Sequence, residues 1–312
     1  MNDISAININ SNRMKHLFPT LLLLLCAGFV SCDKEYDADT AESLYQPVPG
    51  KRLVASVKTT IAAKGGEDIH EHNFTYDAQE RIKAVRSNLV IHTPVIVNNN
   101  GFRDTIDTWY NMDSRADYFY RGAELEIAYT VSIEYPEYPG MNSRTSSSVY
   151  GTFNRGGVLD RFSQASFSYS ATSLQKAYND AGFCFEVTRS GGNVTGYIKS
   201  DAVTESVLDD KSGYYHYTSL KNNTNFDFSA YFGYWGVEQC VSLMSNSYRA
   251  PFRLAAFGML GATSPKLPLG VIESDADGNE VRLYGEWELD GKECPVSYVD
   301  PDGRRTVITY NK

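Results

Sequence analysis

Runs of alternating apolar and polar residues fill the chain from residue 51 onward, and they are rich in tyrosine and β-branched side chains. Runs of this kind, bounded by glycine, asparagine and aspartate, predict β-strands joined by tight turns. No proline- or serine-rich stretch interrupts the pattern. Residues 51–312 are therefore expected to form one large β domain, although two domains would also fit.

A turn pattern recurs along this domain. Its first residue, usually Asp or Asn, caps the turn, and its fourth adopts the left-handed backbone conformation that glycine favours. The cases begin at Asp77, Asn154, Thr188, Asp275 and Asp300. In the first case Glu80 replaces the glycine, and its Cβ is expected to cause mild strain.

Two hairpins can be aligned in detail. A loop centred on Gln79 places Tyr76 opposite Ile82 and Phe74 opposite Ala84, so that one face is apolar near the turn. Near the end of the chain, Asp290-Gly291 predicts a two-residue turn between residues 280–289 and 292–299. With the turn at Asp300, the last segments are expected to form a three-stranded meander.

Two segments depart from the strand pattern. Residues 174–180 precede Ala181-Gly182 and predict a short helix that glycine closes. Residues 231–246 carry apolar side chains at helical intervals and predict a helix that covers the sheet, although Gly233 and Gly236 weaken it. One or two short helices packed on the sheet are therefore expected.

The segment before the β region has the pattern of an export signal. Charged residues after Met14 are followed by an apolar run over residues 17–30 and then by Ser31-Cys32. The run is shorter than the roughly twenty residues that a transmembrane helix needs. We assign residues 1–31 to a lipoprotein signal peptide and place the true start at Met14.

The residues before Cys32 resemble the lipobox of bacterial lipoproteins, in which lipid is attached to the cysteine thiol, although Phe29 stands where leucine is usual. The alternative is an ordinary secretory signal that happens to contain a cysteine. Residues 32–50 begin with an acidic stretch and predict a lipidated, solvated tether. Such a stretch resembles the signal for transfer to the outer leaflet in Bacteroidota-type lipoproteins. The expected location is the outer membrane, anchored in the bilayer through acylated Cys32, with the domain at the cell surface; an inner-facing domain is the alternative.

Charge and cysteine content narrow the function further. The net charge is −9 and no segment collects Lys or Arg on one face, which excludes a nucleic-acid partner. After processing, Cys184, Cys240 and Cys294 remain. Three cysteines cannot all pair, so both buried free thiols and one disulfide with one free thiol stay open.

The sequence contains no nucleophile elbow, phosphate loop or zinc signature. His70 and His72 share a strand face, but the hairpin register places Asn88 and Arg86 opposite them, with His92 about 13 Å along the strand, so no metal site is expected. The oxygen-rich stretch from Asp275 has its glycine at the fourth place instead of the sixth that a calcium loop needs, and predicts a plain turn.

Acidic and aromatic side chains supply the remaining candidates. The carboxylates of residues 201–210 could provide an acid and a base, although such a cluster is more typical of a solvated loop. A second candidate is an aromatic surface on which sugar rings or extended peptides could stack. Its residues are Trp109, Tyr110, Tyr135, Tyr138 and Trp235. The alternative is that these side chains are core residues or cross-strand pairs.

Two motifs carry a family resemblance. The string Phe74-x-Tyr76-Asp77-x-x-Glu80-Arg81-Ile82 resembles a YD-type repeat, which usually has glycine in place of Glu80. Farther along stand Asn223-Thr224-Asn225-Phe226-Asp227, then Gly258-Met259-Leu260-Gly261 and Ser264-Pro265-Lys266-Leu267-Pro268, before the final hairpins. This order resembles the Bacteroidota lipoprotein family known as domain-of-unknown-function family 4595, over most of residues 51–312. It departs at Glu80 and over residues 95–108.

The resemblance implies a mainly β fold, an antiparallel up-and-down meander that forms a large curled sheet, and it implies no assigned activity. Together with the missing catalytic motifs, it favours a non-enzymatic binding module without a cofactor. The expected ligand is an extracellular or envelope glycan or protein. The alternatives are a polymer-degrading hydrolase of the envelope and a scaffold for an envelope assembly.

Overall fold

Strands dominate the computed structural model, which describes residues 42–63, 66–99, 102–233, 252–274 and 277–311. Within these ranges the helical elements are a 3-10 turn, η1 (Pro139–Met141), and one four-residue helix, α2 (Phe228–Tyr231). The strands are β1 (Val54–Ala63), β2 (Gly66–Tyr76), β3 (Ile82–Asn99), β4 (Phe102–Arg121), β5 (Glu124–Glu134), β6 (Ser143–Phe153), β7 (Leu159–Phe162), β8 (Ala165–Ser170), β9 (Ser173–Asn179), β10 (Phe183–Ser190), β11 (Asn193–Asp201), β12 (Val207–Asp210), β13 (Tyr215–Lys221), β14 (Lys266–Ser274), β15 (Glu280–Tyr284), β16 (Glu286–Leu289), β17 (Pro295–Val299) and β18 (Arg305–Tyr310).

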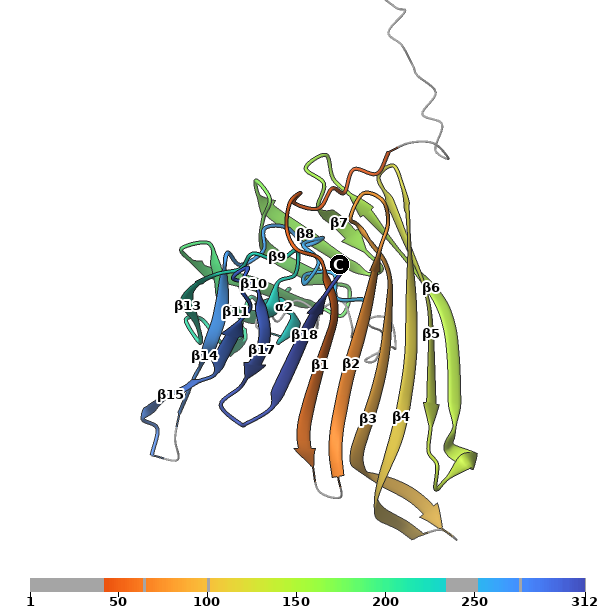
Figure 1. Cartoon of the computed structure of the whole chain (residues 1–312). Coiled ribbons are helices and arrows are strands. Elements are labelled where there is room, and N and C mark those ends of the chain that lie inside the picture. The colour runs from red at the N-terminus through yellow and green to blue at the C-terminus, as the bar shows by residue number, and fades with distance from the viewer. Residues whose placement is uncertain (1–41, 64–65, 100–101, 234–251, 275–276, 312) are drawn as a thin grey trace, which may run out of the picture. The chain divides into compact units, whose positions relative to one another are not determined.

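One antiparallel sheet contains fifteen of these strands. It runs in sequence order from β12 back to β1, and β18, β17 and β16 continue it because β1 pairs with β18. Strands β13, β14 and β15 form a separate three-stranded sheet. The large sheet curls but does not close, and β12 and β16 are its two edges (Figure 1). The expected up-and-down meander is confirmed. A three-stranded end is also present as β16, β17 and β18, but its predicted first strand, residues 280–289, is divided at Gly285, and residues 280–284 form β15 of the second sheet, which was not predicted.

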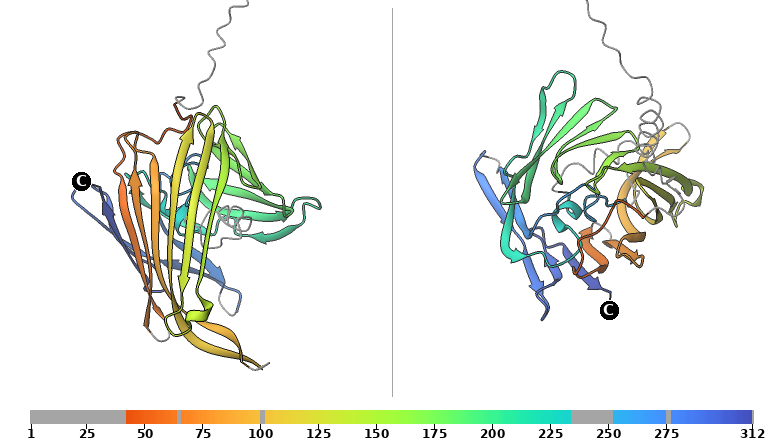
Figure 2. Two further views of the ribbon diagram at one scale, coloured as in Figure 1. Left: turned by 90° about the vertical axis from the view of Figure 1, so that its right-hand side faces the viewer. Right: turned by 90° about the horizontal axis from the view of Figure 1, so that it is seen from above.

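The inward face of the curl packs around a chain segment that returns inside it. This segment comprises residues 226–231, which include α2, and residues 252–264, and Figure 2 shows it enclosed when the molecule is seen from above. Phe226, Phe228 and Leu260 from it are fully buried. They meet inward side chains such as Phe74 and Ile127 in one hydrophobic core. Each large apolar side chain buried there contributes roughly 1.5–3 kcal/mol.

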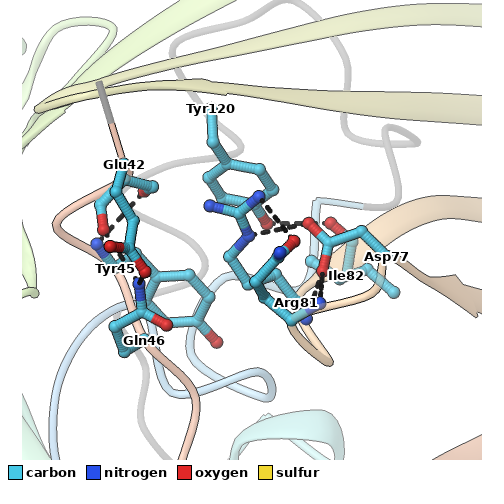
Figure 3. A network of polar contacts seen from close by, with 9 residues as sticks. Glu42, Tyr45, Gln46, Asp77, Arg81, Ile82 and Tyr120 are labelled. Carbon is cyan, nitrogen blue, oxygen red and sulfur yellow. Dashed lines mark hydrogen bonds and ion pairs between the residues drawn. The ribbon is translucent and has the colours of Figure 1, made fainter. Parts of the chain in front are cut away.

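The chain enters the domain through Tyr45, which the sequence assigns to the tether. Its ring is buried and stacks on Tyr120 and Phe153 at centroid distances of 5.9 and 5.4 Å. Beside it, the Arg81 guanidinium lies 4.6 Å from the centre of the Tyr120 ring and pairs with Asp77 at 2.7 Å (Figure 3). Residues from 42 onward therefore belong to the same compact unit as the sheet.

Both helix predictions need correction. Residues 174–179 belong to strand β9 and Asp180 follows in a turn, so the predicted helix is absent from this range. The register shifts at Gln175, so Leu174 and Ala177 are both buried at a spacing of three, which imitates a helical repeat. Helix α2 ends at Tyr231, where the predicted helix was to begin, and Gly233 follows it at a φ of +89°. Residues 234–246 of that prediction lie outside the described residues.

The turn predictions succeed in part. Gly157 and Gly303 have positive φ and donate to the carbonyl oxygens of Asn154 and Asp300 at 3.0 Å, as expected. The turn assigned to Thr188 is wrong, because Gly191 and Gly192 form the loop and Thr188 lies within β10. Asp275 lies outside the described residues.

The two aligned hairpins also differ in detail from the prediction. At Asp290 the loop is longer than two residues, since the Asp290 amide bonds to Cys294 and Glu293 takes the positive φ. In the first hairpin Tyr76 does pair with Ile82, but a bulge moves Phe74 opposite Val85 instead of Ala84.

Glu80 has a φ of +61°, as its place in the first turn implies. A residue with a Cβ in the left-handed conformation is strained by roughly 1–2 kcal/mol, and glycine at position 80 would relieve this strain. Glycine also gives the unfolded chain more conformational entropy, which offsets about half of the relief. Glu80→Gly should therefore raise the free energy of unfolding by about 0.5–1 kcal/mol. Urea denaturation would measure this. Gly303→Ala, the reverse change in a matched turn, should lower stability; a loss of stability in Glu80→Gly would contradict the turn assignment.

Candidate functional site

A hollow of about 280 Å³ lies on the outward face of the large sheet, across strands β4 to β7. Three side chains form one cross-strand row in it, because Phe119 pairs with Glu126 and Glu126 with Tyr150. The two rings are unusually exposed for their type, Phe119 at 47% and Tyr150 at 61%. We call this hollow the aromatic slot. Strands spaced about 4.8 Å apart hold its two rings on either side of the Glu126 carboxylate.

A second row of charged side chains continues the hollow toward the β4–β5 turn. Arg121 pairs in register with Glu124, and Arg161 lies two strands farther on, beyond Thr152. None of these three charged groups forms an ion pair or hydrogen bond with another described residue. Two arginines and the carboxylates of Glu124 and Glu126 give the hollow no net charge. Its polar groups are thus available to the hydroxyl groups of a neutral ligand.

Strand alternation fixes the slot rigidly. Tyr118, Leu125 and Val149 are the inward neighbours of the slot residues along their strands, and all three are buried in the core. A side chain between two anchored neighbours cannot change face without a shift in register. The slot is therefore preformed, and the Tyr150 hydroxyl already lies 3.4 Å from the Glu126 carboxylate.

Two other hollows have their polar groups occupied. In the one of about 200 Å³ beside the chain entry, the Lys51 ammonium donates to the Asn222 carbonyl at 2.7 Å. In the one of about 260 Å³ beside the smaller sheet, Arg304 pairs with Asp302 at 3.1 Å. The aromatic slot is consequently the best candidate for recognition.

The structure does not bring the predicted aromatic residues together as one surface. Tyr110 is buried and packs against Tyr135 at a centroid distance of 5.2 Å, on the inward side. Trp109 is half-buried and stacks on His92 at 6.5 Å. Tyr138 is half-buried before η1, and Trp235 lies outside the described residues. The alternative interpretation, core and cross-strand pairs, describes Tyr110 and Tyr135.

Phe119 and Tyr150 were not among the residues predicted from the sequence, although a signal for them was present. In the run Asp117-Tyr118-Phe119-Tyr120-Arg121, strand alternation places Phe119 on the face that is exposed to solvent, where a polar side chain would be expected. Tyr150 does the same between Val149 and Gly151. Aromatic residues at polar positions of a strand were the useful signal, and an abundance of aromatic residues was not.

The two histidines of β2 lie on the inward face, and their register was predicted one residue off. His72 faces Ser87, and His70 faces Leu89. No group of three His, Cys, Asp or Glu side chains within the described residues could hold a metal ion. Two of the carboxylates in residues 201–210 have separate structural hydrogen bonds. Asp201 caps its loop by accepting from the Thr204 amide at 2.7 Å, and Asp209 accepts from the Tyr197 hydroxyl.

His72 and Ser87 form a serine–histidine pair with the wrong polarity for catalysis. The His72 Nδ1 lies 2.7 Å from the Ser87 hydroxyl, and its Nε2 lies 3.2 Å from the Arg253 guanidinium. Arginine can only donate, so Nε2 accepts and the neutral ring carries its proton on Nδ1, toward Ser87. The ring cannot remove a proton from Ser87 in this arrangement. Burial, and then the charge of Arg253, hold the His72 pKa well below its usual value.

The cysteines within the described residues, Cys184 and Cys294, are buried free thiols. Cys240 lies outside the described residues. Burial raises the pKa of the Cys184 thiol, which disfavours the reactive thiolate.

No described helix has the length and apolar character needed to span a membrane.

Comparisons with known proteins find similarity only among solved structures, and at low sequence identity. No protein-family model matches the chain, and no curated protein matches it significantly. A porin-like protein from Bacteroides uniformis is 14% identical, with 86% of this chain and 100% of that one covered and a TM-score of 0.47. A porin-like protein from Bacteroides vulgatus is 12% identical, with 83% and 99% covered and a TM-score of 0.27.

The buried neutral His72 makes stability depend on pH. Between its folded pKa and the unfolded value of 6.5, the unfolded chain binds a proton that the folded chain excludes, so stability falls as pH drops below 6.5. Below pH 6.5, the free energy of unfolding of His72→Gln should depend less steeply on pH than that of the wild type, by up to about 1.4 kcal/mol per pH unit, because glutamine binds no proton. Urea denaturation from pH 8 to pH 5 would measure it. The two proteins should show parallel curves above pH 7; parallel curves below pH 6.5 would contradict a buried neutral ring.

Proposed function

We propose that this chain is a lipid-anchored envelope lipoprotein whose β domain binds a glycan in the aromatic slot, without catalysing a reaction on it. The exposed rings of Phe119 and Tyr150 beside a carboxylate are the observation that carries the binding proposal. Aromatic faces stack on the apolar faces of sugar rings, while charged groups accept and donate to hydroxyls. The resemblance to the Bacteroidota lipoprotein family is part of the same proposal.

The anchor and the location rest on the sequence. Apolar residues 17–30, Ser31 and Cys32 support export and acylation, and the acidic residues behind Cys32 support transfer to the outer leaflet of the outer membrane. Each buried methylene of the attached lipid supplies about 0.8 kcal/mol, so several chains hold the protein stably. A surface location would present the slot to extracellular glycans.

Cys32→Ser should abolish the anchor. The wild-type protein, expressed with its signal in a bacterium that makes lipoproteins, should enter the detergent phase in a phase-separation experiment and incorporate labelled fatty acid. Cys32→Ser should lose both properties, because no thiol remains to carry lipid. Cys26→Ser, within the apolar run, is the matched control and should keep both. Unchanged detergent partitioning of Cys32→Ser would remove the anchor proposal.

The binding proposal predicts that Phe119→Ala and Tyr150→Ala each weaken glycan binding about tenfold or more, since removing an aromatic ring that stacks on a ligand costs on the order of 1.5 kcal/mol. A glycan array would identify retained oligosaccharides, and calorimetry would measure the decrease in affinity. Both side chains point outward, so melting temperatures should change little. Tyr284→Ala removes a ring that is 48% exposed elsewhere and is the control. Equal binding by all variants, or no retained oligosaccharide, would refute the proposal.

One observation favours a hydrolase as the second candidate. Glu124 and Glu126 both line the slot and lie two residues apart on one face of β5, about 6.7 Å along the strand. Inverting glycosidases hold their two carboxylates about 6.5–9.5 Å apart. The slot is open to solvent, however, and encloses neither group, so binding is better supported. New reducing ends that disappear in Glu126→Gln would favour the hydrolase.

A further inference from the structure

A second hollow, of about 460 Å³, lies on the same outward face of the sheet. Three arginines line it, each from a different strand: Arg86 from β3, Arg115 from β4 and Arg144 from β6. We call them the arginine patch. The floor between them consists of small hydroxyl side chains, Thr130 and Ser132 of β5.

The charges of the patch are only partly balanced. Arg86 and Arg115 pair directly across β3 and β4, and like charges in that position destabilise a sheet. Asp117 holds Arg115 through two hydrogen bonds of 2.7 Å. The guanidinium groups of Arg86 and Arg144 form no ion pair or hydrogen bond with any described residue, so they are available to an anion.

One carboxylate shares the hollow. Asp113 faces it and accepts a hydrogen bond from the Asn88 side chain at 2.6 Å. Three arginines against Asp113 and Asp117 still leave the patch positive, in a chain whose net charge is −9. A locally positive patch on an acidic protein attracts negatively charged groups of a ligand.

The slot and the patch lie along the same strands, with one cross-strand row, Asp117, Ala128 and Ser148, between them. Phe119 and Arg115 are four positions apart on β4, about 13 Å. Between them, β5 and β6 present only the small outward side chains of Ala128 and Ser148, which pair with each other. An elongated ligand can therefore lie along both hollows without crossing a bulky side chain.

We infer that the arginine patch is a second subsite of the same groove, which binds a carboxylate or sulfate group on an acidic oligosaccharide whose neutral ring stacks in the aromatic slot. Arginine suits this role because its planar fork matches the two oxygens of such a group. The inference rests on the proposed function and deepens it, since it names the ligand class as an anionic glycan.

An array of neutral, uronate-containing and sulfated oligosaccharides, probed with the wild-type domain at physiological salt, tests the inference. Retention of uronate-containing or sulfated members above their neutral counterparts supports it, and shows which anion the patch takes. Retention of neutral members alone overturns the subsite and leaves the proposed function intact. Retention of none overturns both.

Variants separate the patch from the slot. Arg86→Gln and Arg144→Gln should each weaken binding of the best acidic oligosaccharide at least tenfold, and should reduce the dependence of affinity on salt concentration. Neither should change binding of a neutral oligosaccharide retained by the slot. Arg155→Gln alters an exposed arginine in the β6–β7 turn and is the matched control. Unchanged acidic binding in both patch variants, with Phe119→Ala still impaired, would overturn the subsite alone.

Discussion

The architecture depends on the burial of one face of a long sheet against the chain that returns inside its curl. Phe74 from β2 illustrates this, because its ring meets Phe226 and Phe257 of the returning chain at about 5 Å. Asp227 holds the start of α2 there by accepting from the Ser229 and Ala230 amides. Without this internal segment the apolar side chains of the inward face would be exposed to water, and their burial would no longer favour a curled sheet.

That constraint decides where function can lie. Strand alternation commits every second side chain to the core, so the outward side chains of β4, β5 and β6 are positioned by neighbours that cannot move. The slot and the patch consist of such side chains, and need no loop to order them. The pair of His72 and Ser87, by contrast, faces inward, where its polarity suits a structural hydrogen bond between strands and not catalysis.

Local chemistry was readable from the sequence, and long-range placement was not. Asn154 and Asp300 predicted their turns correctly because a capping side chain and a left-handed glycine act within four residues. The bulge at Gln175 was invisible, because it depends on the partner strand β8. Aromatic side chains were judged by abundance, so core residues such as Tyr110 were nominated while Phe119 was overlooked. The alternation around Phe119 was the stronger signal, since only an outward ring can reach a ligand.

The position of Leu44, where the chain enters the domain, shows at which end of the sheet the slot lies. The Leu44 amide donates to the Gly122 carbonyl at 2.9 Å, in the turn that joins β4 to β5. Arg121 and Glu124, the outer row of the slot, close that same hairpin. The slot therefore lies at the end of the sheet where the chain enters the domain, and the arginine patch lies farther along the strands.

The charges of the two hollows then decide how an acidic glycan would lie in the groove. An anionic group placed in the slot would meet no net charge, because two arginines there offset the carboxylates of Glu124 and Glu126, whereas in the patch it would face the guanidinium groups of Arg86 and Arg144. Because opposite charges attract, the second orientation is favoured. On the proposed function, a bound acidic glycan would extend from the chain entry toward the far end of the strands, with its anionic group at that far end.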